Sequence, residues 1–188
     1  MQNVLTHLNR SAIGLLLGLL IMLSRPYPLS GIIHLADVTH AALFIGGFIG
    51  LGYRWFGGFV ALAVTLDMLS IASGTDPFCL SPAYGFLLPA FAVIWYAGAA
   101  CGNAPVKVQL PLGLAGFSLA QVTAFFISSG SFYFLSGKFV DPTLTEMLAR
   151  TERYLPGYFS SSFIYVALFL TLAAAFALIN RRQGVHEH

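Results

Sequence analysis

The chain has 188 residues, of which 57% are hydrophobic and only 9% are charged. About a quarter of the residues in a soluble domain are charged, so this composition excludes an ordinary soluble protein and indicates one embedded in a lipid bilayer. The formal net charge is only +2 and the nine Lys and Arg residues are scattered along the chain, which argues against a nucleic-acid partner.

A transmembrane helix needs about 20 mostly apolar residues to cross roughly 30 Å of hydrocarbon. The apolar runs of the sequence divide into six such segments, and no internal repeat or linker separates them. We therefore predict an all-α integral membrane protein, with six transmembrane helices in a single domain over residues 1–188. The predicted spans cover residues 11–23, 33–53, 56–71, 83–101, 110–135 and 158–180.

The first span follows Arg10, as the core of a secretory signal would, but no small-x-small cleavage pattern comes after it. We therefore expect a retained helix. Gly14 and Gly18 are four residues apart, which places both on one helix face and lets another helix approach closely. That second helix belongs either to a docking partner or to the chain's own bundle, and the sequence leaves both open.

Polar residues interrupt the second and third spans. The second opens with His34, Asp37 and His40, and Asp67 lies four residues before the end of the third. The two histidines are six residues apart, so they do not share a helix face. A carboxylate within a span costs a few kcal/mol unless it faces water or a partner. Asp67 is therefore a candidate ligand-binding residue, and a salt bridge or helix cap near the membrane surface is the alternative.

The polar connector between the third and fourth spans, residues 75–84, presents a cysteine between two prolines. Pro77 and Pro82 fix their own φ and bias the preceding residue away from helical geometry, so we expect a stiff, irregular loop. Cys79 on this loop is a candidate metal ligand or nucleophile, and passive packing is the alternative. A helix over 83–101 puts Cys101 roughly 28 Å away on the opposite membrane face, which excludes a disulfide.

The longest connector, residues 136–157, contains a predicted helix of its own. Asp141 as N-cap and Pro142 at the first helical position are typical of a helix start. Apolar and charged residues then recur on opposite faces: Leu144, Met147, Leu148 and Leu155 against Glu146, Arg150 and Arg153. We expect an amphipathic helix that lies over the mouth of the bundle.

Basic residues near helix ends indicate the orientation, because short cytoplasmic loops are enriched in Lys and Arg. With both termini in the cytoplasm, the inner and outer sets are Arg10, Arg54, Lys107, Arg181 and Arg182 against Arg25, Lys138, Arg150 and Arg153. This orientation places the three long connectors and the polar helix ends on the outer side. The sequence thus predicts a cavity that is open to the outside and closed towards the cytoplasm.

Six short helices, elaborate first, third and fifth connectors and a length near 190 residues are similar to the substrate-binding S-components of energy-coupling-factor (ECF) vitamin transporters. Within that group, three stretches resemble the solitary cobalamin (vitamin B12) transporters of the BtuM type in Gram-negative bacteria. They are His34-Leu-Ala-Asp37-Val-Thr-His40, Asp67, and Asp76-Pro-Phe-Cys79-Leu-Ser-Pro-Ala-Tyr84. The general shape covers nearly the whole chain, and the specific part is the Cys79 loop with its flanks.

The resemblance implies a substrate-binding subunit for uptake of cobalamin across the bacterial inner membrane. Because a thiolate is a soft, strongly donating ligand, we further expect Cys79 to take an axial position of the cobalt and to displace an upper ligand such as water or cyanide. Contacts with cobalamin are further expected from Asp67, Asp76, Tyr84, His34, Asp37 and His40. Gly14 and Gly18, where S-components usually carry alanines, would dock a coupling subunit whose ATPases are encoded elsewhere. The chain itself has no P-loop motif, and no intrinsic cofactor is expected.

Three alternatives stay open from the residues alone. The chain could be an S-component for another vitamin, such as thiamin or riboflavin, in which Cys79 is incidental. It could be a thiol-dependent membrane hydrolase or transferase, which needs a general base that only His34 or His40 can supply. A purely structural subunit is the third, and a carboxylate within a span, Asp67, argues against it.

The expected orientation predicts one-sided labelling of Cys79. A membrane-impermeant thiol reagent should reach Cys79 only from the periplasmic side of inner-membrane vesicles when no ligand is bound, because its loop lies outside. Labelling from the cytoplasmic face would overturn both the orientation and the outward cavity.

Overall fold

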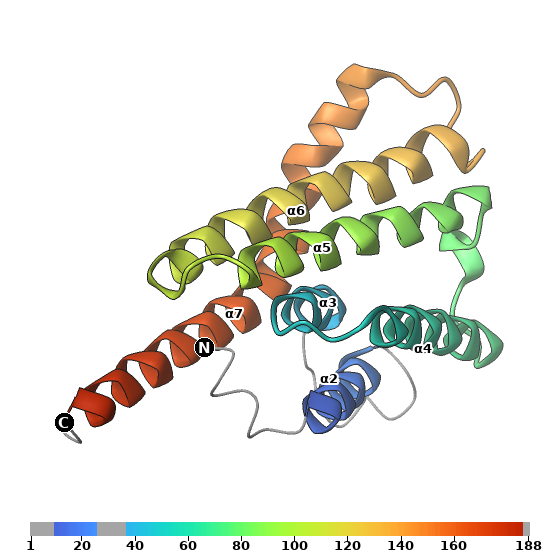
Figure 1. Cartoon of the computed structure of the whole chain (residues 1–188). Helices are drawn as coiled ribbons and strands as arrows, with labels where there is room; N and C mark the ends of the chain where they lie inside the picture. Colours follow the sequence, from blue (N-terminus) through green and yellow to red (C-terminus); the bar gives the residue numbers. More distant parts are fainter. Residues whose placement is uncertain (1–9, 26–36, 186–188) are drawn as a thin grey trace.

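The computed structural model describes residues 10–25 and 37–185, so the predicted site residue His34 lies outside the described residues. Every regular element in the described part is helical (Figure 1). The elements are α2 Arg10–Ser24, α3 Thr39–Phe48, α4 Tyr53–Ala72, η2 Pro77–Cys79, η3 Pro82–Phe86, α5 Leu87–Gly102, α6 Val106–Leu135 and α7 Leu144–Val185, where η marks short 3₁₀ turns.

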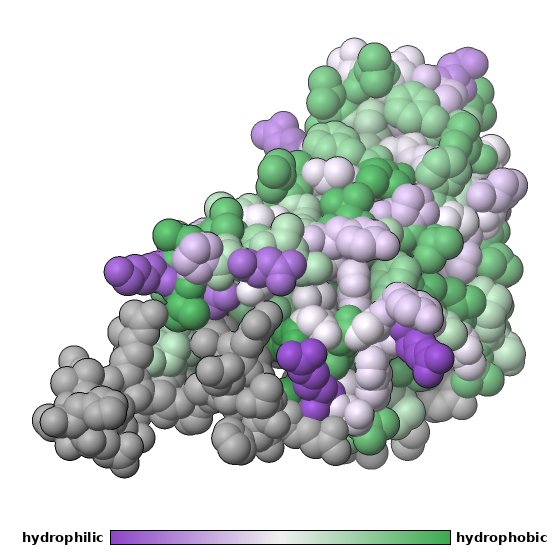
Figure 2. All heavy atoms as spheres, in the orientation of Figure 1, coloured by the Kyte–Doolittle hydropathy of each residue, from purple (hydrophilic) through white to green (hydrophobic). Residues whose placement is uncertain are grey.

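Within residues 10–25 and 37–185, four helical stretches are long and apolar enough to cross a membrane: Tyr53–Ala72, Pro82–Gly102, Val106–Leu135 and Leu144–Ala175. Apolar side chains cover most of the face shown in Figure 2, and hydrophilic groups are few and scattered. The prediction of an all-helical chain is therefore confirmed for the described residues, and these four stretches have the length and apolar composition of membrane spans. Helices α2 and α3 have only 15 and 10 residues, so six full spans are not shown.

Local polar groups and a glycine explain why the second predicted span is short. Helix α3 begins at Thr39, whose backbone N–H and hydroxyl donate to the Asp37 carboxylate at 2.8 Å and 2.6 Å. At the other end Gly50 has a φ of +71°, a left-handed conformation that ends a helix. The hydropathy of residues 33–53 therefore overestimated the length of the helix.

The amphipathic segment and the last predicted span form one continuous helix, α7, with 42 residues. Pro156 lies inside it, where the missing N–H and the ring disturb the helical hydrogen bonds, and Figure 1 shows a change of direction along α7. The predicted cap at Asp141 was wrong. Asp141 has a φ of +49°, and the Thr143 hydroxyl accepts the Glu146 N–H at 3.3 Å, so the helix begins at Leu144.

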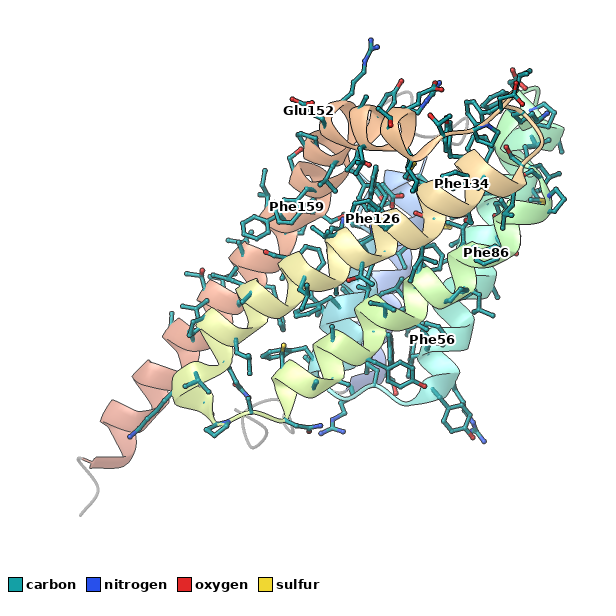
Figure 3. All side chains as sticks on the ribbon, turned by 90° about the horizontal axis from the view of Figure 1, so that it is seen from above. Phe56, Phe86, Phe126, Phe134, Glu152 and Phe159 are labelled. Carbon is teal, nitrogen blue, oxygen red and sulfur yellow. The ribbon has the colours of Figure 1, made fainter. Side chains whose placement is uncertain are left out.

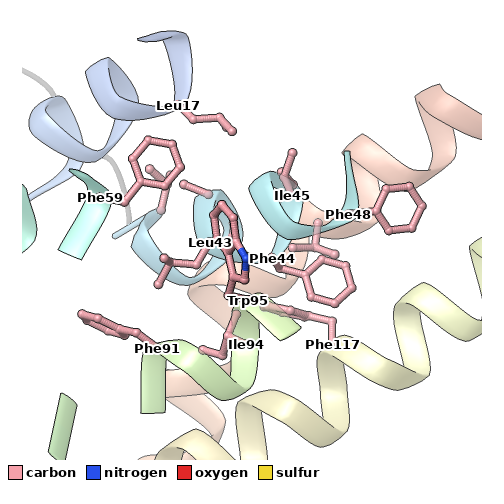
Figure 4. Close-up of a cluster of buried hydrophobic side chains, with 14 of the residues drawn as sticks. Leu17, Leu43, Phe44, Ile45, Phe48, Phe59, Phe91, Ile94, Trp95 and Phe117 are labelled. Carbon is pink, nitrogen blue, oxygen red and sulfur yellow. The ribbon is translucent and has the colours of Figure 1, made fainter. Parts of the chain in front are cut away.

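Helix α3 forms the centre of the bundle and contacts α2, α4, α5 and α7. Leu43 and Phe44 are completely buried, and they belong to the aromatic and aliphatic cluster in Figure 4, together with Trp95 of α5 and Phe117 of α6. Glycines bring α3 and α5 into backbone contact: a Cβ on Gly98 would overlap the carbonyl group of Phe44. The same holds for Gly47 and Gly102 against the carbonyl oxygens of Trp95 and Phe48.

The pair Gly14 and Gly18 faces the chain's own bundle. Gly14 is buried, and a Cβ there would lie 2.6 Å from ring atoms of Trp55 in α4. A Cβ on Gly18 would lie 3.8 Å from Phe59, also in α4. This geometry favours the intramolecular alternative over a docking strip. The exposed side of α2 carries larger side chains, namely Leu15, Leu16, Leu19 and Met22.

The contact between α3 and α5 predicts that Gly98→Ala destabilises the fold by about 1–3 kcal/mol, because the new methyl group must displace a backbone. The matched control is Gly57→Ala on α4, where no atom lies within 4 Å of the new Cβ and alanine is the better helix former. Thermal unfolding of the purified protein in detergent measures both. Equal unfolding midpoints for the two variants would contradict the close contact.

Candidate ligand-binding site

A cavity of about 570 Å³ opens at one end of the bundle, where α4 and α6 end and α7 begins. In Figure 3 the first part of α7, marked by Glu152, runs back beside the end of α6 that carries Phe134. Aromatic rings form much of the cavity wall, and its polar lining residues include Asp67, Tyr84, Ser128, Ser129, Tyr133 and Arg150. The structure thus brings the end of the third predicted span, the Cys79 loop and the amphipathic segment to one place.

The central ion pair of this region joins Asp67 to Arg25, a residue that sequence reasoning counted only as a charge outside the membrane. Arg25 follows the end of α2 and is 8% exposed. Its guanidinium forms a hydrogen-bonded ion pair with Asp67 Oδ1 and donates to the Ala63 carbonyl oxygen at 3.2 Å. It also donates to Thr39 Oγ1 at 3.2 Å. Arg25 therefore ties α2 to both α3 and α4.

Asp67 lines the cavity, but its carboxylate is already occupied. The second oxygen, Oδ2, accepts a hydrogen bond from the Tyr84 hydroxyl at 2.8 Å. Both oxygens thus have partners within the protein, as the salt-bridge alternative expects. Asp67 neutralises Arg25 and fixes the hydroxyl of Tyr84, which itself lines the cavity.

Asp37 and Asp76 have local structural roles. The Asp37 carboxylate accepts the backbone N–H of Thr39 at the start of α3 and lies 3.8 Å from the Arg25 guanidinium, so Asp37 and Asp67 share one cation. Asp76 accepts the Phe78 backbone N–H at 2.9 Å and thereby caps η2. Neither of these aspartates belongs to the cavity lining.

Cys79 is the last residue of η2 and directly follows Phe78 in the chain. The Phe78 ring lines the cavity and lies 5.5 Å from the Phe132 ring, centroid to centroid. The Lys138 ammonium lies 5.4 Å from the Phe78 centroid, a cation–π contact from the connector between α6 and α7. These contacts fasten the Cys79 loop to the cavity wall.

His40 is half-buried in the core and is not among the cavity-lining residues. Its Nδ1 lies 3.2 Å from Gln121 Nε2, and its Nε2 lies 3.4 Å from the Tyr158 hydroxyl. Among the predicted ligand-binding residues whose side chains the structure describes, Asp67 and Tyr84 line the cavity. Cys101 is buried near the far end of α5, with its thiol 3.4 Å from the Leu112 carbonyl oxygen.

Sequence reasoning did not identify the particular rings of the cavity wall, such as Phe78, or the cation Arg150. Phe78 stands beside Cys79 in the sequence and could have been noticed there. Arg150 had been placed on the polar face of an amphipathic helix, whereas its guanidinium lies 4.7 Å from the Phe139 centroid. Comparisons with protein-family models and with curated proteins found no match for the chain.

The Arg25–Asp67 pair predicts that Arg25→Met destabilises the protein by about 2 kcal/mol or more, because it leaves a carboxylate without its cation. The double variant Arg25→Met with Asp67→Leu should regain most of that loss. Arg150→Met serves as the control, since the Arg150–Glu146 pair is much more exposed and its loss should cost far less stability. The free energy of unfolding, measured in detergent, tests this prediction. An equal decrease in Arg25→Met and Arg150→Met would contradict a structural role for Arg25.

Proposed function

We propose that the chain is the substrate-binding membrane subunit of a bacterial uptake system for cobalamin. It lies in the inner membrane with both termini in the cytoplasm and takes its ligand from the outer side. The main support for this proposal is that the Cys79 loop lies at the wall of the cavity. The residue before the cysteine lines the cavity, and the loop is fixed by a cap at Asp76 and by ring contacts.

The cavity has the character of a small-molecule site. Its volume of about 570 Å³ falls within the range of about 300–1,000 Å³ that is typical of such sites, with apolar walls and a few polar groups. A corrin is a broad macrocycle with amide side chains, and aromatic rings with scattered hydroxyl groups suit it. Cobalamin is larger than a drug-sized ligand, so one face of the macrocycle enters the cavity and the remainder extends past its mouth.

Cys79 supplies the reactive group in this proposal. A thiolate is a soft donor that suits an axial position of cobalt, and coordination itself deprotonates the thiol. When cyanide occupies that position, it leaves with the electron pair of the cobalt–carbon bond while the thiolate pair forms the sulfur–cobalt bond. The proton released by the thiol is available to the departing cyanide, and the oxidation state of cobalt does not change. Decyanation is thus ligand exchange, and the chain remains primarily a transporter.

A coupling subunit and ATPases encoded elsewhere are the proposed partners. Gly14 packs against Trp55, so such a partner would meet the exposed side chains of α2, among them Leu15 and Leu19, rather than the glycine pair. An S-component for another vitamin uses the same cavity, and binding of thiamin or riboflavin without any corrinoid would identify it. A thiol enzyme with His40 as base has less support, because both ring nitrogens of His40 already face other side chains.

The thiolate proposal predicts that cobalamin bound to the wild-type protein has a visible spectrum distinct from free cyanocobalamin. Cys79→Ala should remove this spectral change, because no sulfur then reaches the cobalt, although rim contacts still hold some ligand. Cys101→Ala is the matched control and should leave the spectrum of the complex unchanged. An unaltered cyanocobalamin spectrum in the wild-type complex would return Cys79 to a passive role.

A further inference from the structure

Two charged side chains line the cavity among the described residues, and only one of them has a buried partner of opposite charge. Asp67 forms an ion pair with Arg25 and accepts a further hydrogen bond from Tyr84, so both of its oxygens are occupied. Arg150, on the first turns of α7, is the cation of the described lining. It is half-buried, and it is the charged group of the cavity that the Arg25–Asp67 pair does not explain.

Arg150 is held in place by three side chains. Its Nε and Nη2 donate to Glu146 Oε1 at 3.0 Å and 2.6 Å. The carbon at the centre of its guanidinium lies 4.7 Å from the Phe139 centroid and 5.3 Å from the Tyr133 centroid, two cation–π contacts. Glu146 Oε2 in turn accepts the Tyr133 hydroxyl at 2.9 Å, which fastens this part of α7 to α6. The guanidinium is therefore fixed at the cavity wall before any ligand arrives.

The bonds to Glu146 occupy only one edge of the guanidinium. Within the part of the chain that the structure describes, Nη1 has no hydrogen-bond partner. A guanidinium has five N–H groups in a planar fork, which matches the paired oxygens of a phosphate or a carboxylate. Arg150 thus retains donors that suit an oxyanion in the cavity.

A second cation lies against the same aromatic wall. The Lys138 ammonium is 5.4 Å from the Phe78 centroid. The Phe132 ring lies 5.5 Å from Phe78 and 5.9 Å from Phe139, so it connects the rings beneath the two cations. One carboxylate pairs with the guanidinium, and the ammonium adds a further positive charge to this wall. Two cations against one carboxylate favour a ligand with a negative charge.

We propose that Arg150 binds an anionic phosphate group of the ligand and thereby determines specificity. With cobalamin as ligand, an inference that rests on the function proposed above, this group is the phosphodiester that joins the corrin to its nucleotide. The other side chains of the corrin periphery are neutral amides, so the phosphodiester is the part of the molecule that a guanidinium distinguishes. Corrinoids that carry the phosphate should therefore bind better than those that lack it.

The test compares cobinamide phosphate with cobinamide, two corrinoids that differ only in the phosphate, by titration calorimetry of the detergent-purified protein. A hydrogen bond to a charged group is strong enough that cobinamide phosphate should bind the wild-type protein about tenfold or more tightly. Arg150→Met should bring the ratio of the two affinities close to one. Arg150→Lys keeps the charge without the fork and should give an intermediate ratio. Higher ionic strength should lower the wild-type ratio, because salt screens a half-buried charge.

Arg153→Met is the matched control. Arg153 lies three residues further along α7, 5.9 Å from the Tyr154 centroid, and is not part of the cavity lining. Its variant should keep the wild-type ratio. The affinity for cobinamide itself should be the same in wild type and in Arg150→Met, which shows that the cavity of the variant is intact.

The possible failures can be told apart. Equal affinities of the two corrinoids for the wild-type protein, or a ratio that persists in Arg150→Met, would overturn the inference while the proposed function stands. Failure of cobalamin and of both cobinamides to bind would overturn the proposed function, and the inference with it.

Discussion

A polar side chain inside a membrane-spanning bundle must find its partner within the protein, because hydrocarbon offers none. Arg25 shows this constraint most directly. It is buried at the end of α2, and its guanidinium bonds to groups on α3 and α4, including Asp67. The pair therefore holds three helices together at the level of the cavity. Tyr84 extends the network to the turn that follows the Cys79 loop.

The opposite requirement applies where α3 meets α5, because these two helices approach through glycines and apolar side chains. Gly47 and Gly98 let the backbones of α3 and α5 touch, and large side chains such as Phe44 and Trp95 fill the space beside them. A ten-residue helix can lie in the middle of the bundle because its neighbours cover it on several sides. The apolar cluster around α3 is thus separate from the ion pair of Arg25 and Asp67, which lies at the cavity.

The sequence predicted the helical membrane class because hydropathy depends on composition rather than on contacts. It also predicted that Asp67, Tyr84 and the Cys79 loop would gather at one end, since segment order and length determine depth. It did not predict the partners of these residues. The pairing of Arg25 with Asp67 and the inward direction of Gly14 depend on how helices rotate about their axes, and apolar residues on all sides of a membrane helix conceal that rotation.

The predicted helix lengths were wrong for a related reason. Hydropathy averaged over a window does not detect the hydrogen bond from Thr39 to Asp37 or the left-handed Gly50. The predicted second helix was therefore too long. The averaged hydropathy likewise does not register that α7 continues through Pro156, since the charged face of its first turns resembles a separate surface helix. The surroundings of His40 were least accessible, because its ring nitrogens face Gln121 and Tyr158, which are distant in the sequence.

The proposed binding of cobalamin depends on Cys79 as a ligand of the cobalt. X-ray absorption at the cobalt edge, recorded on the purified complex with cobalamin, identifies the atoms bound to the metal. The account predicts a sulfur neighbour in the wild-type complex and in Cys101→Ala, and none in Cys79→Ala. A cobalt surrounded only by light atoms in the wild-type complex, as in free cyanocobalamin, would contradict it.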